Sequence, residues 1–267
     1  MEHTGNIRKM EAFPEKAVQY FLPLGNERIY MNELIGVPIT LEYLGHIYCM
    51  KCGRETRKSF AQGYCYPCFR SAPETEECVL RPELCRAHEG VARDMEYAKE
   101  HCLIEQVVYL SLTSGMKVGV TRSSQVPTRW IDQGAIRAIE LARTPNRFKA
   151  GLIELALKDH IADKTNWRKM LSDLDPRDAD LLGEKKRLSE LLQPDLVSYL
   201  SGDDTIIELE YPVLQYPEKI LSLNFEKNPA VSGVLSGIKG QYLMFDQNRV
   251  INMRKFGGYL VRLKAGN

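Results

Sequence analysis

The sequence contains no long, uninterrupted apolar run. Nowhere in its 267 residues do about 18 apolar residues follow one another, so it predicts no membrane-spanning helix. The first residues, MEHTGNIRKMEAFPEK, also lack the basic segment followed by an apolar segment that is typical of a secretion signal. We therefore expect a cytoplasmic protein without a membrane partner.

The sequence also has almost no net charge. Its formal net charge is +1, which argues against a chain that is basic throughout, as some nucleic-acid-binding proteins are. It contains no internal repeat and no low-complexity tract, so a repeat array and a disordered chain are both disfavoured. A hydrophobic share of 44% is ordinary for a globular protein, and the length allows about two domains.

The charges that are present are segregated along the chain. Residues 49–70 carry five basic side chains and one acidic, and residues 117–149 carry seven basic and two acidic. Residues 173–210 carry four basic and eleven acidic side chains. Positive segments bind phosphate backbones in some proteins and are only solvated surface in others, and charge alone favours neither interpretation.

All seven cysteines fall between residues 49 and 102, and four of them form two CxxC pairs. Cys49 and Cys52 are separated from Cys65 and Cys68 by twelve residues, a spacing that lets four thiolates surround one structural Zn²⁺. Disulfides are disfavoured in a cytoplasm that keeps thiols reduced. A redox-active CxxC is a weaker alternative, because paired motifs this close together rarely act independently.

A second structural zinc site is predicted from the remaining cysteines. His88 follows Cys85 with CxxH spacing, so Cys78, Cys85, His88 and Cys102 form a Cys₃His ligand set. His101 is an alternative ligand to His88. The competing interpretation is three buried apolar cysteines and a surface histidine.

Hydrophobic periodicity and the positions of glycine and proline indicate an α+β fold. They predict strands over residues 29–48, 107–112, 117–121, 136–142, 238–245 and 258–263. They predict helices over residues 9–20, 83–101, 125–133, 147–161 and 178–192.

Five segments follow from this pattern. We expect an N-terminal β segment, a zinc-binding region, a β-β-α-β-α core, a helical connector and a C-terminal β domain, over residues 1–48, 49–104, 105–172, 173–204 and 205–267. The last should be a small barrel or sandwich. The N-terminal strands are expected to join it, because one β-rich block lies at each end of the chain.

The residues best suited to phosphodiester chemistry lie between residues 107 and 166. A nuclease needs a group that activates or orients the attacking water, a cation on the phosphate and a carboxylate that holds a divalent metal. Tyr109, Arg129 and Glu154 are of these three types. Taken singly, each has an ordinary explanation: a packed aromatic, an arginine stacked on Trp130 and a solvated helix residue.

The order of these residues resembles the GIY-YIG nuclease superfamily, whose core is β-β-α-β-α. Tyr109 matches its first tyrosine, Gly119 the glycine of its second motif, Arg129 its arginine and Glu154 its metal-binding glutamate, while Asn166 matches its asparagine loosely. The chain departs from that pattern in two places, because Lys117 replaces the second tyrosine and Val107 replaces the glycine of the first motif.

The resemblance covers about 60 residues and implies that Tyr109, Lys117, Arg129, Glu154 and Asn166 form the catalytic site. More widely, the chain resembles an uncharacterised bacterial family in which a zinc-binding N-terminal half precedes such a core. The runs RPELCRAH, KVGVTR, RWIDQGA and DKTNW are typical of that family.

These features predict a nuclease or phosphodiesterase that uses Mg²⁺ or Mn²⁺ and acts on DNA or RNA. Further contacts to the nucleic acid are expected from Arg122, Arg147, Lys149 and Trp130. The first alternative is a non-catalytic, zinc-containing RNA-binding protein on a degenerate nuclease fold, which the loss of the second tyrosine favours. The second is a protein-interaction scaffold whose acidic segment, residues 173–210, faces a basic partner.

Overall fold

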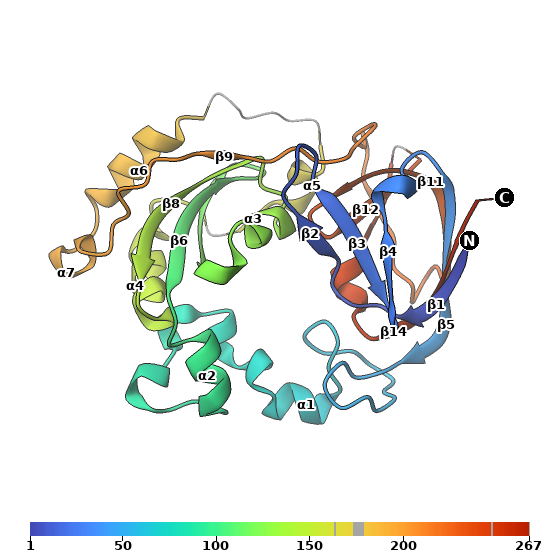
Figure 1. Cartoon of the computed structure of the whole chain (residues 1–267), viewed down its shortest axis with the longest axis horizontal. Helices are drawn as coiled ribbons and strands as arrows, with labels where there is room; N and C mark the ends of the chain where they lie inside the picture. The colour runs from blue at the N-terminus through green and yellow to red at the C-terminus, as the bar shows by residue number, and fades with distance from the viewer. Residues whose placement is uncertain (163, 173–178, 247, 267) are drawn as a thin grey trace. The chain divides into compact units, whose positions relative to one another are not determined.

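The computed structural model describes residues 1–162, 164–172, 179–246 and 248–266, and its α+β composition confirms the predicted fold class. The chain divides into two compact units (Figure 1). Unit 1 contains residues 1–70, residues 171–172 and the chain from Glu210 onward, and unit 2 contains residues 71–170 and 179–209. None of the helices in the described part of the chain has both the length and the apolar character that a membrane span requires.

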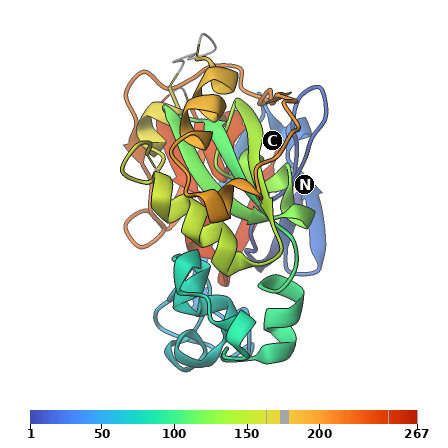
Figure 2. The same ribbon diagram turned by 90° about the vertical axis from the view of Figure 1, so that its left-hand side faces the viewer.

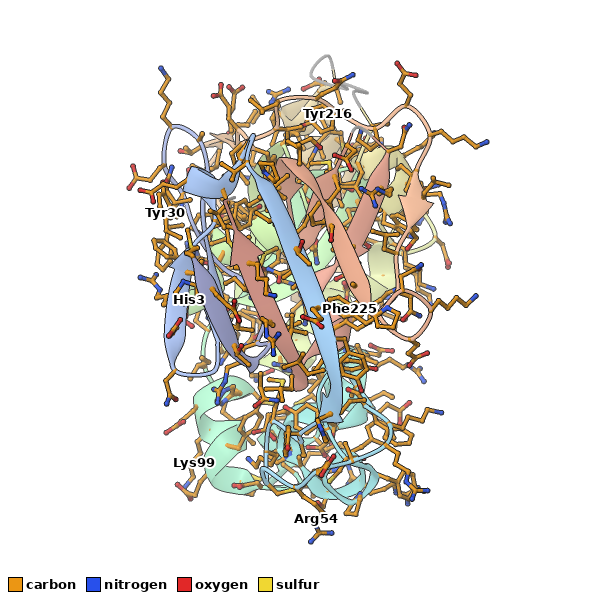
Figure 3. All side chains as sticks on the ribbon, turned by 90° about the vertical axis from the view of Figure 1, so that its right-hand side faces the viewer. His3, Tyr30, Arg54, Lys99, Tyr216 and Phe225 are labelled. Carbon is orange, nitrogen blue, oxygen red and sulfur yellow. The ribbon has the colours of Figure 1, made fainter. Side chains whose placement is uncertain are left out.

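Unit 1 is built on a seven-stranded sheet that combines both ends of the chain. The strand order is β1 (Glu2–Asn6), β14 (Tyr259–Ala265), β5 (Pro38–Ile47), β11 (Ala230–Lys239), β12 (Tyr242–Phe245), β13 (Arg249–Asn252) and β10 (Leu221–Ser222). Figure 3 shows the N-terminal β5 between the C-terminal β14 and β11. The expected joining of the two β-rich blocks is therefore confirmed, and the sheet is open, not closed into a barrel.

A smaller sheet in unit 1 replaces the helix expected over residues 9–20. It consists of β2 (Glu11–Phe13), β3 (Gln19–Leu24) and β4 (Glu27–Tyr30). In β3, Tyr20, Leu22 and Leu24 are buried while the residues between them are partly exposed. This alternation has the period of a strand, so the prediction of a helix was wrong here.

Unit 2 is built on a four-stranded antiparallel sheet in the order β7 (Met116–Arg122), β6 (Gln106–Leu112), β8 (Arg137–Thr144) and β9 (Ile207–Glu208). Strand β6 lies in the centre and is buried along its whole length. Strand β7 forms one edge of the sheet, where side chains from both faces can meet.

Helices cover both faces of this sheet (Figures 1 and 2). On one face, α4 (Arg147–Leu157), α6 (Leu181–Ser189) and α7 (Pro194–Val197) bury leucine and isoleucine side chains against Val108, Leu110 and Ile139. Helix α3 (Thr128–Asp132) lies on the other face. The order β6, β7, α3, β8, α4 is the order predicted from the sequence.

Several predicted elements are shorter than expected. Residues 83–101 form brief 3₁₀ turns followed by α2 (Met95–His101), because Gly90 interrupts the chain with a left-handed φ of 77°. The predicted strand 238–245 is divided between β11 and β12 by a turn at Gly240, where φ is 61°. The remaining α-helices of the described residues are α1 (Tyr66–Ser71) and α5 (Trp167–Met170). The last predicted helix begins at residue 178, which lies outside the described residues.

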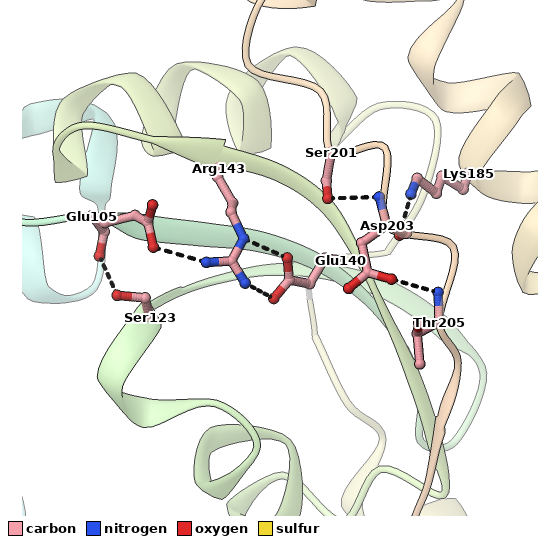
Figure 4. Close-up of polar contacts among 8 residues, drawn as sticks. All are labelled: Glu105, Ser123, Glu140, Arg143, Lys185, Ser201, Asp203 and Thr205. Atoms are coloured by element: carbon pink, nitrogen blue, oxygen red, sulfur yellow. Dashed lines mark hydrogen bonds and ion pairs between the residues drawn. The ribbon is translucent and has the colours of Figure 1, made fainter.

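Polar contacts tie the chain after α7 to the rest of unit 2 (Figure 4). The buried Lys185 ammonium donates to the Asp203 carbonyl at 2.7 Å and to the Asp204 carboxylate at 2.9 Å. On β8, the Arg143 guanidinium bridges the carboxylates of Glu140 and Glu105. Because Glu140 is almost fully buried, this pairing compensates a charge that would otherwise be costly to bury.

Candidate functional site

The four cysteines of the two CxxC pairs converge at the end of β5. Their Sγ atoms all lie within 4.8 Å of one another, and the Sγ atoms of Cys52 and Cys65 are 3.8 Å apart. A tetrahedral zinc site with Zn–S bonds of about 2.3 Å places its sulfurs roughly 3.8 Å apart. The four-cysteine group therefore fits a structural zinc ion.

The Cys49 thiol of this group has a lowered pKa, which favours metal binding. Burial opposes ionisation of Cys49, but backbone hydrogen bonds from Cys65 and Cys52 outweigh it and lower the Cys49 pKa to about 6. A thiolate is the form that binds metal, so Cys49 can begin coordination at neutral pH.

The second group contains three cysteines, all buried. The Sγ atoms of Cys78, Cys85 and Cys102 lie within 4.8 Å of one another, in a small core that also contains Ala87 and Ala98. Hydrogen bonds from the thiols of Cys102 and Cys78 lower the pKa of the Cys85 thiol below its ordinary value. These residues fit three corners of a zinc tetrahedron, so a metal ion here takes its fourth ligand from elsewhere.

The two histidines considered as that fourth ligand make other contacts. His88 stacks on Phe148 with ring centroids 4.3 Å apart. His101 stacks on Tyr97 at 3.7 Å, and its Nδ1 lies 3.0 Å from the Tyr97 carbonyl oxygen. The structure thus brings together three of the four predicted ligands of the second site.

A cleft of about 380 Å³ lies at the β7 edge of unit 2. It contains most of the residues expected at the catalytic site, together with the segment that joins Cys78 to Cys85. Its lining comprises Val79, Leu80, Arg81, Pro82, Glu83, Lys117, Gly119, Val120, Arg129, Gln133, Glu154, Leu155, Lys158 and Lys164. Five of these side chains are cationic and two are acidic, so the cleft has a net positive charge.

Three elements meet at this edge. Strand β7 supplies Lys117 and Gly119, α3 supplies Arg129 from one face of the sheet, and α4 supplies Glu154 from the other. Strand β7 is the last named strand on this side of the sheet, and beyond it, among the described residues, only Ala162 pairs with the chain, by accepting the Val118 backbone N–H at 3.0 Å. Side chains from both faces therefore reach the same space.

Tyr109 lies beneath the cleft and is completely buried. Its hydroxyl donates a hydrogen bond of 2.9 Å to Gln133 Oε1. Burial raises the pKa of Tyr109 to about 12; the Arg129 guanidinium partly offsets this effect, and the Glu154 carboxylate adds to it. Tyr109 therefore holds its proton at neutral pH and lies within the electrostatic reach of both cleft residues.

Gly119 makes room for the Tyr109 hydroxyl. The two residues are directly opposite in the β6–β7 ladder, so they share a face of the sheet. A Cβ atom at Gly119 would lie only 2.7 Å from Tyr109 Oη. The absence of a side chain at Gly119 thus has a direct steric reason.

The remaining predicted site residues lie outside the lining of the cleft. Asn166 caps α5 by accepting a hydrogen bond from the Lys169 backbone at 3.2 Å. Arg122 ends β7 and acts electrostatically on Tyr97 and His101 in α2.

Three predicted nucleic-acid contacts belong to the first turn of α4 or to the core. Arg147 donates to the carbonyl oxygens of Cys78 and His101, so its guanidinium holds the second cysteine group to α4. The backbone of Lys149 is capped by Asn146. Trp130 is 2% exposed and packs 5.8 Å from the Tyr109 ring, so it has a packing role in place of the expected base-stacking role.

Sequence reasoning missed several residues of the cleft. Gln133 and Lys158 lie four positions after Arg129 and Glu154, so helical spacing could have identified them as neighbours. Nothing in the sequence indicates that residues 79–83 line the same cleft, because that contact depends on how the second cysteine group folds.

Comparison with known proteins identifies a family match. Residues 36–261 match the family described as "Protein of unknown function (DUF2797)". No curated protein and no solved structure matches the chain significantly.

Proposed function

The chain belongs to the DUF2797 family, and from the geometry of its cleft we propose that it is a divalent-metal-dependent nuclease with a GIY-YIG-like site. The observation that carries this proposal is the meeting of Arg129, Glu154 and Lys117 at one edge of a sheet. The buried Tyr109 hydroxyl lies within the electrostatic reach of the first two.

Phosphate binding is the step that the cleft supports most directly. Arg129 presents paired donors to phosphate oxygens, and Lys117 and Lys158 add positive charge that attracts a polyanion. Lys117 lines the cleft at the position where the superfamily has its second tyrosine, and its ammonium adds positive charge there.

The carboxylates of the cleft fit a hard divalent cation. Glu154 and Glu83 both line it, and Mg²⁺ is commonly held by one or two carboxylates together with substrate phosphates. When bound, such an ion would neutralise charge that develops on the phosphate.

Tyr109 is better suited to orienting reactants than to accepting a proton. A phenol with a pKa of about 12 remains protonated at neutral pH, so it is a hydrogen-bond donor. In hydrolysis, a water oxygen forms a bond to phosphorus and the bond from phosphorus to one sugar oxygen breaks. The Tyr109–Gln133 pair would help to position the phosphate or the attacking water for that exchange.

Cleavage assays test this proposal. Labelled single- and double-stranded DNA and RNA would be incubated with Mg²⁺ or Mn²⁺ and with wild-type protein, Glu154→Gln or Glu190→Gln. Glu190 is an exposed glutamate after α6 and outside the cleft, so it serves as the matched control. We expect Glu154→Gln to lose at least about 100-fold in rate and Glu190→Gln to behave as wild type. Absence of cleavage on all four substrates, or full activity of Glu154→Gln, would refute the proposal.

A second candidate function is nucleic-acid binding without cleavage, which the surface of the first cysteine group favours. Five exposed cations lie in the segment that carries it, residues 49–70, and Figure 3 labels one of them, Arg54. They are Lys51, Arg54, Arg57, Lys58 and Arg70. Tyr66, which is 54% exposed, offers a ring for base stacking.

Salt dependence separates the two functions. If this surface binds a phosphate backbone, the affinity for nucleic acid should fall steeply as the salt concentration is raised. Replacing Arg54, Arg57 and Lys58 by alanine should then make this dependence of affinity on salt concentration less steep. Such binding without Glu154-dependent cleavage would favour the second candidate. Binding that does not respond to salt, or is absent for DNA and RNA, would remove it.

A further inference from the structure

An apolar tip projects at the rim of the cleft. Val79 and Leu80, which we call the apolar tip, both line the cleft. Leu80 is 87% exposed and Val79 is 38% exposed. Leu155, which is 37% exposed, lines the same cleft from α4.

Local contacts hold the apolar tip in place. Cys78 precedes it and Cys85 follows it, and both are buried in the second cysteine group. The backbone N–H groups of Leu80 and Arg81 both donate to the Glu77 carbonyl, and the Arg81 side chain bonds to the Glu77 and Glu83 carboxylates. The tip is therefore a fixed projection whose ends the cysteine group ties together.

Helix α4 holds the segment 79–83 at a fixed position relative to Glu154, the proposed metal ligand. A Cβ atom at Gly151 would lie 2.7 Å from Glu83 Cα and would collide with the neighbouring backbone of Pro82, so helix and segment are in direct backbone contact. Glu154 lies one helical turn beyond Gly151 on α4. The distance between the apolar tip and Glu154 is consequently set by rigid packing.

The chemistry around the tip indicates its occupant. Cations attract phosphates, whereas the flat faces of unpaired bases pack against apolar side chains, and proteins unstack base steps by inserting leucine or similar wedges. A protein partner fits less well, because lysines such as Lys117, Lys158 and Lys164 are depleted in the cores of protein interfaces.

We propose that the apolar tip is a wedge that contacts or unstacks a base beside the phosphate held in the cleft. The preferred substrate is then nucleic acid with unpaired or easily unstacked bases, such as single strands, mismatches or junctions. This inference rests on the proposed function, because the cleft must hold the phosphate.

The test uses Glu154→Gln protein, which should bind without cleaving, and DNA carrying the fluorescent base 2-aminopurine at successive positions. Unstacking raises the fluorescence of this base, so one position should brighten on binding. Adding Leu80→Ala should remove that signal and weaken binding to a single strand by at least about 5-fold, because a leucine that packs against a base buries apolar surface that alanine largely lacks.

Leu191→Ala is the matched control, since Leu191 is an exposed leucine of unit 2 that lies outside the cleft. It should leave both signals unchanged, and thermal melting should show that Leu80→Ala is folded. Binding with no brightening at any position, or Leu80→Ala equal to its parent, would overturn the wedge and leave the proposed function intact. Failure of the parent to bind any DNA or RNA would overturn the proposed function and the wedge together.

Discussion

Tyr109 and Gly119 form a matched pair on neighbouring strands. The hydroxyl of one occupies the space that a side chain on the other would fill, and from there it bonds to Gln133. The position of the hydroxyl under the cleft thus depends on a residue that carries no functional group of its own.

Gly119→Ala should move the Tyr109 hydroxyl. The added Cβ would lie 2.7 Å from Oη and 2.8 Å from Cζ, so the ring must shift and we expect a loss of about 1–3 kcal/mol in the free energy of unfolding. Urea denaturation measures this loss. Gly115→Ala is the control, because a Cβ there meets nothing within 4 Å. Equal stabilities of the two variants would contradict the packing described for Tyr109.

Tyr109 should also make stability depend on alkaline pH. Its pKa is about 12 in the folded protein, above the ordinary value of 10.0, so its stabilising contribution is complete below about pH 10. That contribution is lost as pH rises through about 12, because the unfolded chain releases the proton first. At about pH 11 the contribution has fallen by roughly 1.4 kcal/mol.

Tyr109→Phe lacks this contribution, so its free energy of unfolding should fall less between about pH 9 and pH 11 than that of the wild type. Denaturant titrations at each pH measure the two slopes. Tyr66→Phe, at an exposed position, should follow the wild type. Parallel slopes for wild type and Tyr109→Phe would show that Tyr109 is not held neutral by burial.

Helix α4 links the cleft to the second cysteine group. Its first residue, Arg147, bonds to carbonyls of that group, Gly151 contacts the backbone of residues 82–83, and Glu154 enters the cleft. Helix α4 thus makes both the contacts to the second cysteine group and the proposed catalytic contact of Glu154. A change at Arg147 should therefore also displace Glu154.

Gly151→Ala tests the contact between α4 and residues 82–83. The substitution has two opposite effects on stability, a gain in helix propensity and a steric collision. Alanine favours a helix interior over glycine by about 1 kcal/mol. Here its Cβ would collide with backbone that cannot rotate away, so we expect net destabilisation of about 1–3 kcal/mol. Gly183→Ala in α6 is the comparison, because the three atoms nearest to its Cβ belong to the Asp180 side chain, which can rotate away at the cost of its capping hydrogen bond to the Gly183 N–H. A stabilised Gly151→Ala would disprove the backbone contact.

At the scale of the whole molecule, each unit contains one cysteine group. The four-cysteine group belongs to unit 1 and the three-cysteine group to unit 2. Metal binding by each group should therefore stabilise its own unit, because ligands that are gathered only in the folded state couple binding to folding.

Zinc content should separate the two groups. We expect two zinc ions per wild-type chain, one in Cys52→Ser and one in Cys85→Ser, as measured by elemental analysis. His88→Ala should keep both, because His88 stacks on Phe148 in the structure. Zinc loss in His88→Ala would assign the fourth ligand to His88, and an unchanged content in Cys85→Ser would show that the second group binds no metal.

Local patterns in the sequence were sufficient for much of this fold. The CxxC spacings predict the first cysteine group because each pair is brought together by a single turn. The β-β-α-β-α order of residues 106–157 follows from hydrophobic periodicity, which depends on near neighbours. The resemblance singled out Lys117, Arg129 and Glu154, and these three residues line one cleft.

The tertiary structure decided what depends on distant contacts. It placed β5 between β11 and β14, strands that follow it by about two hundred residues, and it formed strands where a helix was predicted over residues 9–20. It also brought residues 79–83 into the cleft and assigned Arg147 and Trp130 to packing. The physical reason is that strand pairing and burial are set by surfaces that meet only after collapse, whereas turns and periodicity are properties of short segments.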